Sequence, residues 1–559
     1  MSVPKRLDAY HFYEEGWDSY EQLRESFEWE VPERFNVATY VCDRWADAEG
    51  ERTAIFAEDD DGRERQFTYA DLRERTNQLA NYLASQGVGR GDRVGVNAPQ
   101  KPETVVAHVA AWKLGAVSIP LSTLFGVDAL SYRLDDADAV ACVVDDSNVD
   151  TLRSVRDDVD TLETVLTVDV DSPESGEVDF WEALDGESTE RSVVETAAED
   201  DAIIIYTSGT TGDPKGVRHV HRMLLGQLPL FLTSICNLEL GDDDVFWTPA
   251  EWAWIASLFD VVFPGLYYGK SVLAYDGGQF DPEVAFDLVE RYEVTNLFAP
   301  PTALRMMMRV DDPRERWDVD SVRVVPSGGE SLGQSIVDWA EETFDGAAVH
   351  EGYGQTEANM TVGDCTALAE FREGKMGLAA PGHDVRIVDP QTAEPTVEPG
   401  DVGEIAVRYE GDPVCFVEYL NQPEKTRQKV QNGWLLTEDL GSRDEDGYFT
   451  FKSRKDDVII SAGYRIGPVE IEESLAGHEA VADAAVIGVP DDERGEVPKA
   501  FVVPNEGYAG DEELRAELQN HVKERLAKYE YPREIEFLDE LPKTTTGKVR
   551  RADLQRSED

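Results

Sequence analysis

The sequence predicts an α/β fold in which a large N-terminal domain precedes a small α+β domain. Helix and strand signals alternate along most of the chain, which is typical of α/β folds. Residues 202–206, AIIIY, form a short continuous apolar run, as in a buried parallel strand. Downstream of Gly400, short alternating runs predict antiparallel strands instead. This change of pattern places a domain boundary near residues 453–457.

The spacing of apolar residues predicts individual elements. Residues 71–86 place Leu72, Leu79 and Leu83 on one helical face, and this helix is expected to stop at Gly87. A second helix, at 511–526, carries one apolar stripe formed by Leu514, Leu518, Val522 and Leu526. Strands are predicted at residues 93–96, 403–409 and 447–452.

The chain is strongly acidic. Its 559 residues include 114 Asp and Glu against 52 Lys and Arg, which gives a net charge of −62, and the acids are spread along the whole length. Such a charge repels phosphate backbones and anionic lipids, so nucleic acid and membrane surfaces are not expected as partners. Because 41% of the residues are hydrophobic, the chain can still build cores. Acidic, lysine-poor surfaces are typical of proteins that work in molar salt, where screening shortens to about 3 Å.

Cysteine usage and hydropathy indicate a cytoplasmic protein. The five cysteines have no CxxC pair, which argues against a disulfide framework and a thiolate zinc site: Cys42, Cys142, Cys236, Cys365 and Cys415. The N-terminus lacks the apolar stretch of a signal peptide. The most apolar long stretch, 252–268, is interrupted by Asp260 and Pro264, so no membrane-spanning helix is expected.

A loop suited to phosphate follows the apolar strand directly. In YTSGTTGDPKG, residues 206–216, small residues let backbone N–H groups approach an anion, hydroxyls add donors and Lys215 adds charge. Such clusters are also typical of plain turns, but a turn rarely combines three glycines, four hydroxyl residues and a lysine after a buried strand. A Walker A loop is excluded because Pro214 precedes the lysine and Gly216 follows it.

Together with this loop, the chain resembles the adenylate-forming superfamily of acyl- and aryl-CoA synthetases, luciferases and peptide-synthetase adenylation domains. Seven segments carry the resemblance in the family's order: TSGTTGDPKG (207–216), SGGE (327–330), EGYGQTE (351–357), TED (437–439), SRKDD (453–457), GYRIG (463–467) and PKTTTGK (542–548). Glu438 and Ser453 stand where the family has glycine. The match covers nearly the whole chain, and the medium-chain acyl-CoA synthetase branch is the most similar.

The resemblance implies a two-domain enzyme and a two-step reaction. Residues 1–453 would form an N-terminal domain of packed α/β sheets with a small antiparallel, barrel-like part. Residues 454–559 would form a mobile α+β domain that turns about a hinge at Asp456. The enzyme would use ATP and Mg²⁺ to convert a carboxylic acid to an acyl-adenylate and pyrophosphate, and then CoA to form a thioester and AMP.

The resemblance also implies roles for individual residues in nucleotide binding. Lys548 would reach the carboxylate and the α-phosphate, Asp439 would accept both ribose hydroxyls, and Tyr353 would offer its ring to adenine. The full ATP and AMP set is Thr207, Ser208, Gly209, Thr210, Thr211, Gly212, Lys215, Gly328, Gly329, Glu330, Glu351, Gly352, Tyr353, Gly354, Gln355, Thr356, Asp439, Arg454 and Lys548.

Catalysis, metal binding and thiol transfer would involve further positions. Lys548, Thr356 and Glu357 form the catalytic set. Glu357 would place Mg²⁺, with a hydroxyl of Thr207 or Thr210 as a second ligand. In the second step Gly463 would line the pantetheine tunnel, where a Cβ would obstruct it. The other residues that match CoA-contacting positions are Ala462, Tyr464, Arg465, Arg494, Lys523 and Tyr531.

The acyl pocket is expected to exclude acetate as the sole substrate. Acetate-specific relatives carry a Trp where this chain has Gly354, which should leave room for several carbons. Trp252, Trp254 and Phe259 are expected to shape the pocket, although an ordinary core helix also explains them. Medium-chain, branched and aryl acids all remain open.

Two other functions were weighed against this ligase. One is an adenylation enzyme that loads a carrier protein, and the basic CoA-like positions and the lack of a fused carrier domain argue against it. The other is an acidic interaction protein that has lost its chemistry. That hypothesis predicts damaged motifs, whereas Lys548, Asp439, Glu357 and the phosphate loop are intact.

Overall fold

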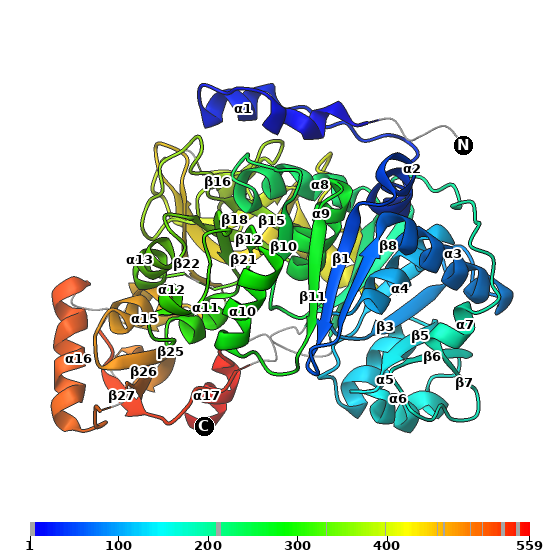
Figure 1. Ribbon diagram of the computed structural model, residues 1–559. Coiled ribbons are helices and arrows are strands. Elements are labelled where there is room, and N and C mark those ends of the chain that lie inside the picture. Colours follow the sequence, from blue (N-terminus) through cyan, green and yellow to red (C-terminus); the bar gives the residue numbers. More distant parts are fainter. Residues whose placement is uncertain are drawn as a thin grey trace.

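The fold is α/β, as predicted, with a large domain of sheets and helices and a smaller C-terminal domain beside it (Figure 1). The computed structural model describes residues 6–207, 214–330, 332–396, 398–455, 457–461, 464–491, 494–505, 507–526, 531–543 and 548–558.

Two large sheets form most of the N-terminal domain. The first has nine described strands, in spatial order β16 (Leu378–Ala379), β15 (Asn359–Gly363), β14 (Ala348–Gln355), β13 (Val324–Gly328), β12 (Asn296–Leu297), β10 (Val245–Trp247), β11 (Ser271–Asp276), β1 (Thr53–Asp59) and β2 (Glu64–Thr68). The second has eight, in the order β19 (Glu418–Tyr419), β9 (Lys215–Val220), β8 (Asp201–Thr207), β4 (Val117–Pro120), β3 (Arg93–Asn97), β5 (Ala139–Asp145), β6 (Thr164–Val168) and β7 (Glu177–Asp179).

The described helices of the large domain lie between and around these sheets (Figure 1). They are α1 (Tyr20–Ser26), α2 (Arg44–Glu49), α3 (Tyr69–Ser85), α4 (Pro102–Lys113), α5 (Val127–Asp136), α6 (Val149–Val155), α7 (Phe180–Leu184), α8 (Met223–Leu230), α9 (Phe263–Tyr267), α10 (Pro282–Tyr292), α11 (Pro301–Met307), α12 (Pro313–Arg316), α13 (Gln334–Thr343) and α14 (Pro423–Lys429).

Helix α4 occupies the core between the two large sheets. All of its residues are buried, and its core cluster joins Ile55 and Val272 of the first sheet to Val94 and Ile203 of the second. Such a buried helix is mostly apolar, and its two charged residues are paired, Glu103 with Arg65 and Lys113 with Asp43. Burial lowers the pKa of its His108 to about 3, so the imidazole is neutral at physiological pH.

A buried ion cluster also joins the two large sheets. The ammonium group of Lys101 lies 2.6 Å from Asp145 at the end of β5 and 3.0 Å from Asp276 at the end of β11. Asp169 is 2.8 Å away on a third side. Because buried ions are costly when unpaired, this cluster fixes how the strand ends approach one another.

Two smaller sheets complete the fold. An antiparallel sheet contains β17 (Val385–Val388), β18 (Gly403–Arg408), β21 (Trp434–Arg443) and β20 (Val430–Gln431), with β22 (Phe449–Arg454) also paired to β21. The C-terminal domain contains β24 (Tyr464–Ile466), β23 (Ile459–Ser461), β26 (Gly495–Pro504), β25 (Val481–Asp491) and β27 (Glu534–Phe537), with helices α15 (Pro468–Ala476), α16 (Glu512–Arg525) and α17 (Arg551–Glu558).

Most predicted elements match these bounds, with two differences. The helix predicted at 71–86 begins at Tyr69 because Thr68 and Asp71 form a capping box. The strand predicted at 202–206 is β8, which pairs in parallel with β4 but antiparallel with β9. The boundary predicted near 453–457 lies between β22 and β23, and Asp456 is outside the described residues.

Neither a membrane span nor a paired cysteine is found in the described structure. None of the described helices is both long enough and apolar enough to span a bilayer. All five cysteines are buried free thiols.

Candidate active site

The motif residues meet where neighbouring strands end. Strands β13 and β14 run in parallel, with Ser327 opposite Glu351 and Gly328 opposite Gly352. The carboxyl ends of parallel strands lie at one edge of a sheet, so the SGGE segment and the EGYGQTE segment are brought side by side. This edge is where ligands bind in open α/β sheets.

Asp439 and Tyr353 face each other beside this edge. The Tyr353 hydroxyl donates a hydrogen bond to Asp439 Oδ2 at 2.8 Å. Asp439 is only 8% exposed, and burial raises its pKa, while the nearby Arg454 opposes that shift. Arg454 is opposite Asp439 in the pairing of β21 with β22, and its Nε lies 3.5 Å from Oδ1. The structure therefore brings the predicted adenine and ribose residues together.

Lys548 reaches this group from the C-terminal domain. The end of the Lys548 side chain lies beside Gly329: its Cε and Nζ are 3.7 Å and 4.0 Å from the position that a Cβ on this glycine would take. The lysine keeps contact with solvent, yet the protein around its ammonium group lowers its pKa, and Arg454 lowers it further. The carboxylates of Glu330 and Asp439 oppose this shift. The two domains are thus oriented so that Lys548 faces the predicted nucleotide site.

Glu357 lies on a separate, buried side of the site. Its side chain is 7% exposed and accepts a hydrogen bond from the Tyr419 hydroxyl. Burial alone would raise the pKa of Glu357, but Lys429, the Tyr419 hydrogen bond and Lys215 bring it below its usual value. The result is a buried, ionised carboxylate, which is the kind of ligand that Mg²⁺ favours.

Neighbouring strands fix the backbone around Glu357. His219 of β9 is bonded through Nε2 to the Thr356 carbonyl at 2.7 Å, and the Phe416 N–H donates to the Glu357 carbonyl at 2.8 Å. Lys215, at the start of β9, lies 5.0 Å from the centre of the Tyr419 ring. Lys215, at the end of the phosphate loop, and Glu357, the predicted metal ligand, therefore both contact Tyr419.

Several predicted residues lie outside the described part of the chain. They are Ser208, Gly209, Thr210, Thr211, Gly212, Asp456, Ala462 and Gly463, together with the side chains of Tyr464 and Arg465. Thr207 and Lys215 flank the first of these gaps and pair with each other across β8 and β9.

Two of the described residues that were predicted to contact CoA, Lys523 and Tyr531, lie against each other. The Lys523 ammonium lies 4.0 Å from the centre of the Tyr531 ring, a cation–π contact at the end of α16. Arg494 immediately precedes β26, and its N–H donates to Asp491 Oδ1 at 2.8 Å.

The residues predicted to shape the acyl pocket lie in closely packed surroundings. A Cβ on Gly354 would lie 1.9 Å from the Asn359 carbonyl oxygen, because β14 and β15 shift register there. The missing side chain thus lets the two strands approach closely, and the expected role of Gly354 in leaving room for the acyl group stays a prediction. Trp252 and Phe259 belong to the main core, and Trp254 packs edge-to-face on Phe125.

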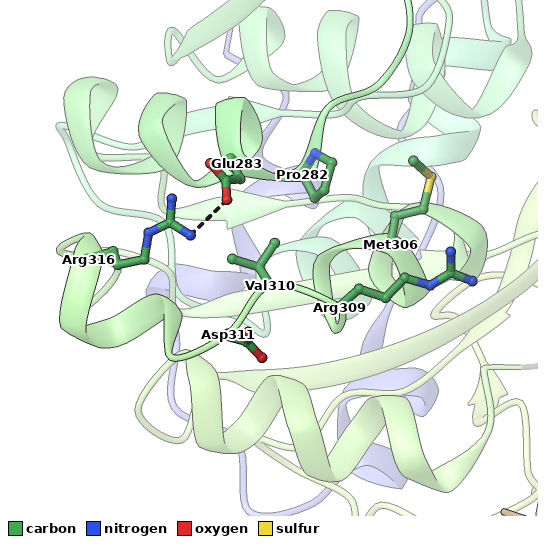
Figure 2. A pocket seen from close by; sticks show the side chains of 7 residues that line it. All are labelled: Pro282, Glu283, Met306, Arg309, Val310, Asp311 and Arg316. Atoms are coloured by element: carbon green, nitrogen blue, oxygen red, sulfur yellow. Dashed lines mark hydrogen bonds and ion pairs between the residues drawn. The ribbon is translucent and has the colours of Figure 1, made fainter. Parts of the chain in front are cut away.

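A cavity of about 410 Å³ lies at α10, α11 and α12 (Figure 2). It opens between α10 and the end of α11, and the Arg316–Glu283 ion pair of 2.8 Å closes one side. None of its lining residues is a predicted site residue: Pro282, Glu283, Met306, Arg309, Val310, Asp311 and Arg316.

Sequence reasoning did not identify two polar residues of the site, Lys429 and Tyr419. Both lie outside the matched motifs; Lys429 contacts Glu438, 9 residues further along the chain, and Tyr419 contacts Glu357, 62 residues before it. The only available signal was the scarcity of lysine, with 15 in the chain.

Comparison with known proteins identifies extensive similarity. Models for "AMP-binding enzyme" and "AMP-binding enzyme C-terminal domain" match residues 42–412 and 470–548. The mitochondrial acyl-coenzyme A synthetase ACSM3 of Mus musculus is 34% identical over 555 residues, covering 97% of this chain and 94% of the relative. The solved structure of the anthranilate CoA ligase AuaEII in complex with anthranoyl-AMP has a TM-score of 0.86 at 28% identity. The match covers 94% of this chain and 98% of that ligase. A benzoate CoA ligase from Burkholderia xenovorans LB400 has a TM-score of 0.81 at 27% identity, and the match covers 93% of this chain and 99% of that ligase.

The Glu351 carboxyl gives a testable pH dependence. Burial, with the nearby Asp364 carboxylate, raises the pKa of Glu351 from 4.5 to about 8. Between these values the folded state holds a proton that the unfolded state has lost, so rising pH favours unfolding. We expect Glu351→Gln to abolish this effect. The difference between the Tm of the variant and the Tm of the wild type should therefore increase from pH 5 to pH 8. Calorimetry in molar KCl measures both Tm values.

The exposed Glu342 of α13 provides the matched control. Glu342→Gln should keep the same Tm difference from wild type at both pH values. An equal Tm difference for Glu351→Gln at pH 5 and pH 8 would contradict the assignment of a protonated Glu351.

Proposed function

The chain belongs to the AMP-binding enzyme family, and we propose that its Lys548 and Asp439 act on the nucleotide in an acyl-CoA synthetase reaction. The enzyme is an AMP-forming acid–thiol ligase that uses ATP, CoA and a carboxylic acid. The observation that carries the residue assignment is the approach of Lys548 to Gly329, beside Asp439 and Arg454.

In the first step the substrate carboxylate attacks the α-phosphorus of ATP and pyrophosphate leaves. Negative charge gathers on phosphoryl oxygens, so a fixed cation is the main requirement. Lys548 supplies that charge, while Asp439 accepts the ribose hydroxyls and Tyr353 lies against adenine. Glu357 would hold Mg²⁺ together with ATP phosphates, which matches the one or two carboxylates usual for this ion in nucleotide sites. Bound Mg²⁺ would neutralise phosphate charge.

In the second step the thiol of CoA attacks the acyl-adenylate carbonyl and AMP leaves. The face that Lys548 occupies must then admit the thiol, so the C-terminal domain turns about Asp456. Arg465, Arg494 and Lys523 supply positive charge for the CoA nucleotide, and Tyr531 supplies an aromatic surface. Gly463 leaves space for the pantetheine arm.

For the substrate we favour a medium-chain, branched or aryl acid over acetate. This follows from the resemblance to the medium-chain branch and from the similarity to ligases named for anthranilate and benzoate. A panel of acids from acetate to decanoate, with benzoate and anthranilate, in the acid-dependent pyrophosphate–ATP exchange assay would identify the class. Acetate as the best substrate would refute this part.

Lys548 is the most direct test of the proposed chemistry. Lys548→Ala should lower acid-dependent pyrophosphate–ATP exchange by about 10²- to 10³-fold, because one preorganised charge is lost. Thioester formation from supplied acyl-adenylate should largely survive. Gly463→Leu should do the reverse and lose only thioester formation.

Arg550→Ala, which removes an exposed charge two residues from Lys548, is the control and should leave both half-reactions unchanged. Normal exchange in Lys548→Ala would refute the role of the lysine. Equal loss of both half-reactions in Gly463→Leu would refute the tunnel.

We also propose that the enzyme works in a reducing, salt-rich cytoplasm. Five buried free thiols support the first property, and a net charge of −62 supports the second. ATP and CoA are anions, so screening eases their approach to an acidic protein. Exchange activity should therefore rise with KCl up to molar concentrations. NaCl and KCl series at constant free Mg²⁺ measure this effect, and full activity with full stability in dilute buffer would contradict it.

A further inference from the structure

The residue before Asp439 has a strained backbone. Glu438 has a φ of +67°, in the left-handed region that favours glycine. Glu404 pairs with Leu440, and Ala406 pairs with Leu436. Between these two pairs β18 has only residue 405, whereas β21 has residues 437–439, so β21 bulges there. Because Asp439 lies inside this irregularity, the direction of its carboxylate depends on how Glu438 is held.

Buried polar groups hold the backbone of Glu438 on two sides. Its N–H donates to Glu404 Oε1 at 2.9 Å, and Glu404 is fully buried. Its carbonyl accepts from the Lys455 N–H at 2.7 Å, while the Lys455 ammonium lies 3.0 Å from Glu404 Oε2. These bonds fix the peptide groups but leave the side chain of Glu438 to another partner.

That partner is Lys429, the last residue of α14. Its ammonium group donates to Glu438 Oε2 at 3.2 Å and to the Thr437 carbonyl at 3.3 Å. The Lys429 side chain is 4% exposed, whereas Glu438 is 53% exposed. A nearly buried ammonium thus binds both the residue with the left-handed backbone and the residue before it.

Lys429 also faces the two acids assigned to nucleotide and metal binding. Its positive charge acts to lower the pKa of both Glu357 and Asp439, and it is the strongest charge opposing the effect of burial on Glu357. Lys429 therefore acts on three carboxylates, together with Lys215 at Glu357 and Arg454 at Asp439.

We propose that Lys429 is a positioning residue for the nucleotide: by binding Glu438 and the Thr437 carbonyl, it holds the left-handed backbone that directs Asp439 at the ribose. The proposal rests on the ribose role of Asp439. It predicts that the need for Lys429 arises from Glu438, because a glycine adopts the same backbone conformation without support.

Equilibrium AMP binding by calorimetry tests this coupling, since AMP engages the ribose site without metal or acid. Lys429→Met should weaken AMP binding about tenfold, as expected for loss of a hydrogen bond to a charged group. Lys429→Arg should restore most of the affinity. Glu438→Gly should bind AMP like the wild type, and adding Lys429→Met to it should weaken binding only about twofold, a coupling that a double-mutant cycle measures.

Lys113→Met is the matched control for the removal of a buried lysine. Lys113 is fully buried in the same domain and lies 2.7 Å from Asp43. This variant should lose stability and keep its AMP affinity.

Equal weakening by Lys429→Met in the wild-type background and in the Glu438→Gly background would overturn the proposal, as would unchanged affinity in Lys429→Met. A wild type that binds no AMP would refute the ribose role and this inference together. A wild type that binds AMP normally but shows no acid-dependent exchange would refute only the proposed reaction.

Discussion

The candidate site depends on one contact between the domains, the approach of Lys548 to Gly329. The other described residues assigned to ATP and AMP lie on or beside strands β13, β14, β21 and β22, with Thr207 and Lys215 on β8 and β9. In the proposed reaction this contact would supply a cation where a phosphoryl oxygen gathers charge. It would also give the small domain a use, since moving that domain would remove the lysine when a thiol must enter.

Charge imposes a second constraint on the same site. The protein is strongly acidic, yet its substrates are anions, so cations must be concentrated where those anions bind. Lys215 and Lys429 lie around Glu357, and Arg454 and Lys548 lie around Asp439. The chain therefore combines a strongly acidic composition with a few cations gathered around the residues assigned to nucleotide and metal binding.

Sequence and structure inform different parts of this picture. Local periodicity predicted the α/β fold and helix α3, because these features depend on short segments, whereas the grouping of Lys548 with Asp439 followed from the resemblance to the adenylate-forming superfamily. Glu438 stands where the resembling family has glycine, and that was a signal for its left-handed backbone, whereas its contact with Lys429 depends on how α14 packs beside β21 and could not be predicted. Gly354 shows the same limit, since only the neighbouring strand reveals that its missing side chain is needed for close backbone approach.

A reversible tether between the domains tests the central claim most directly. Lys452 of β22 and Glu470 of α15 form a 2.5 Å contact between the domains, and the five native cysteines are buried, so Lys452→Cys with Glu470→Cys can be joined by a short cleavable bismaleimide. We predict that the tethered enzyme retains acid-dependent pyrophosphate–ATP exchange, loses thioester formation from supplied acyl-adenylate, and regains it when the linker is cleaved. Thioester formation at the untethered rate while the linker is intact would contradict the account.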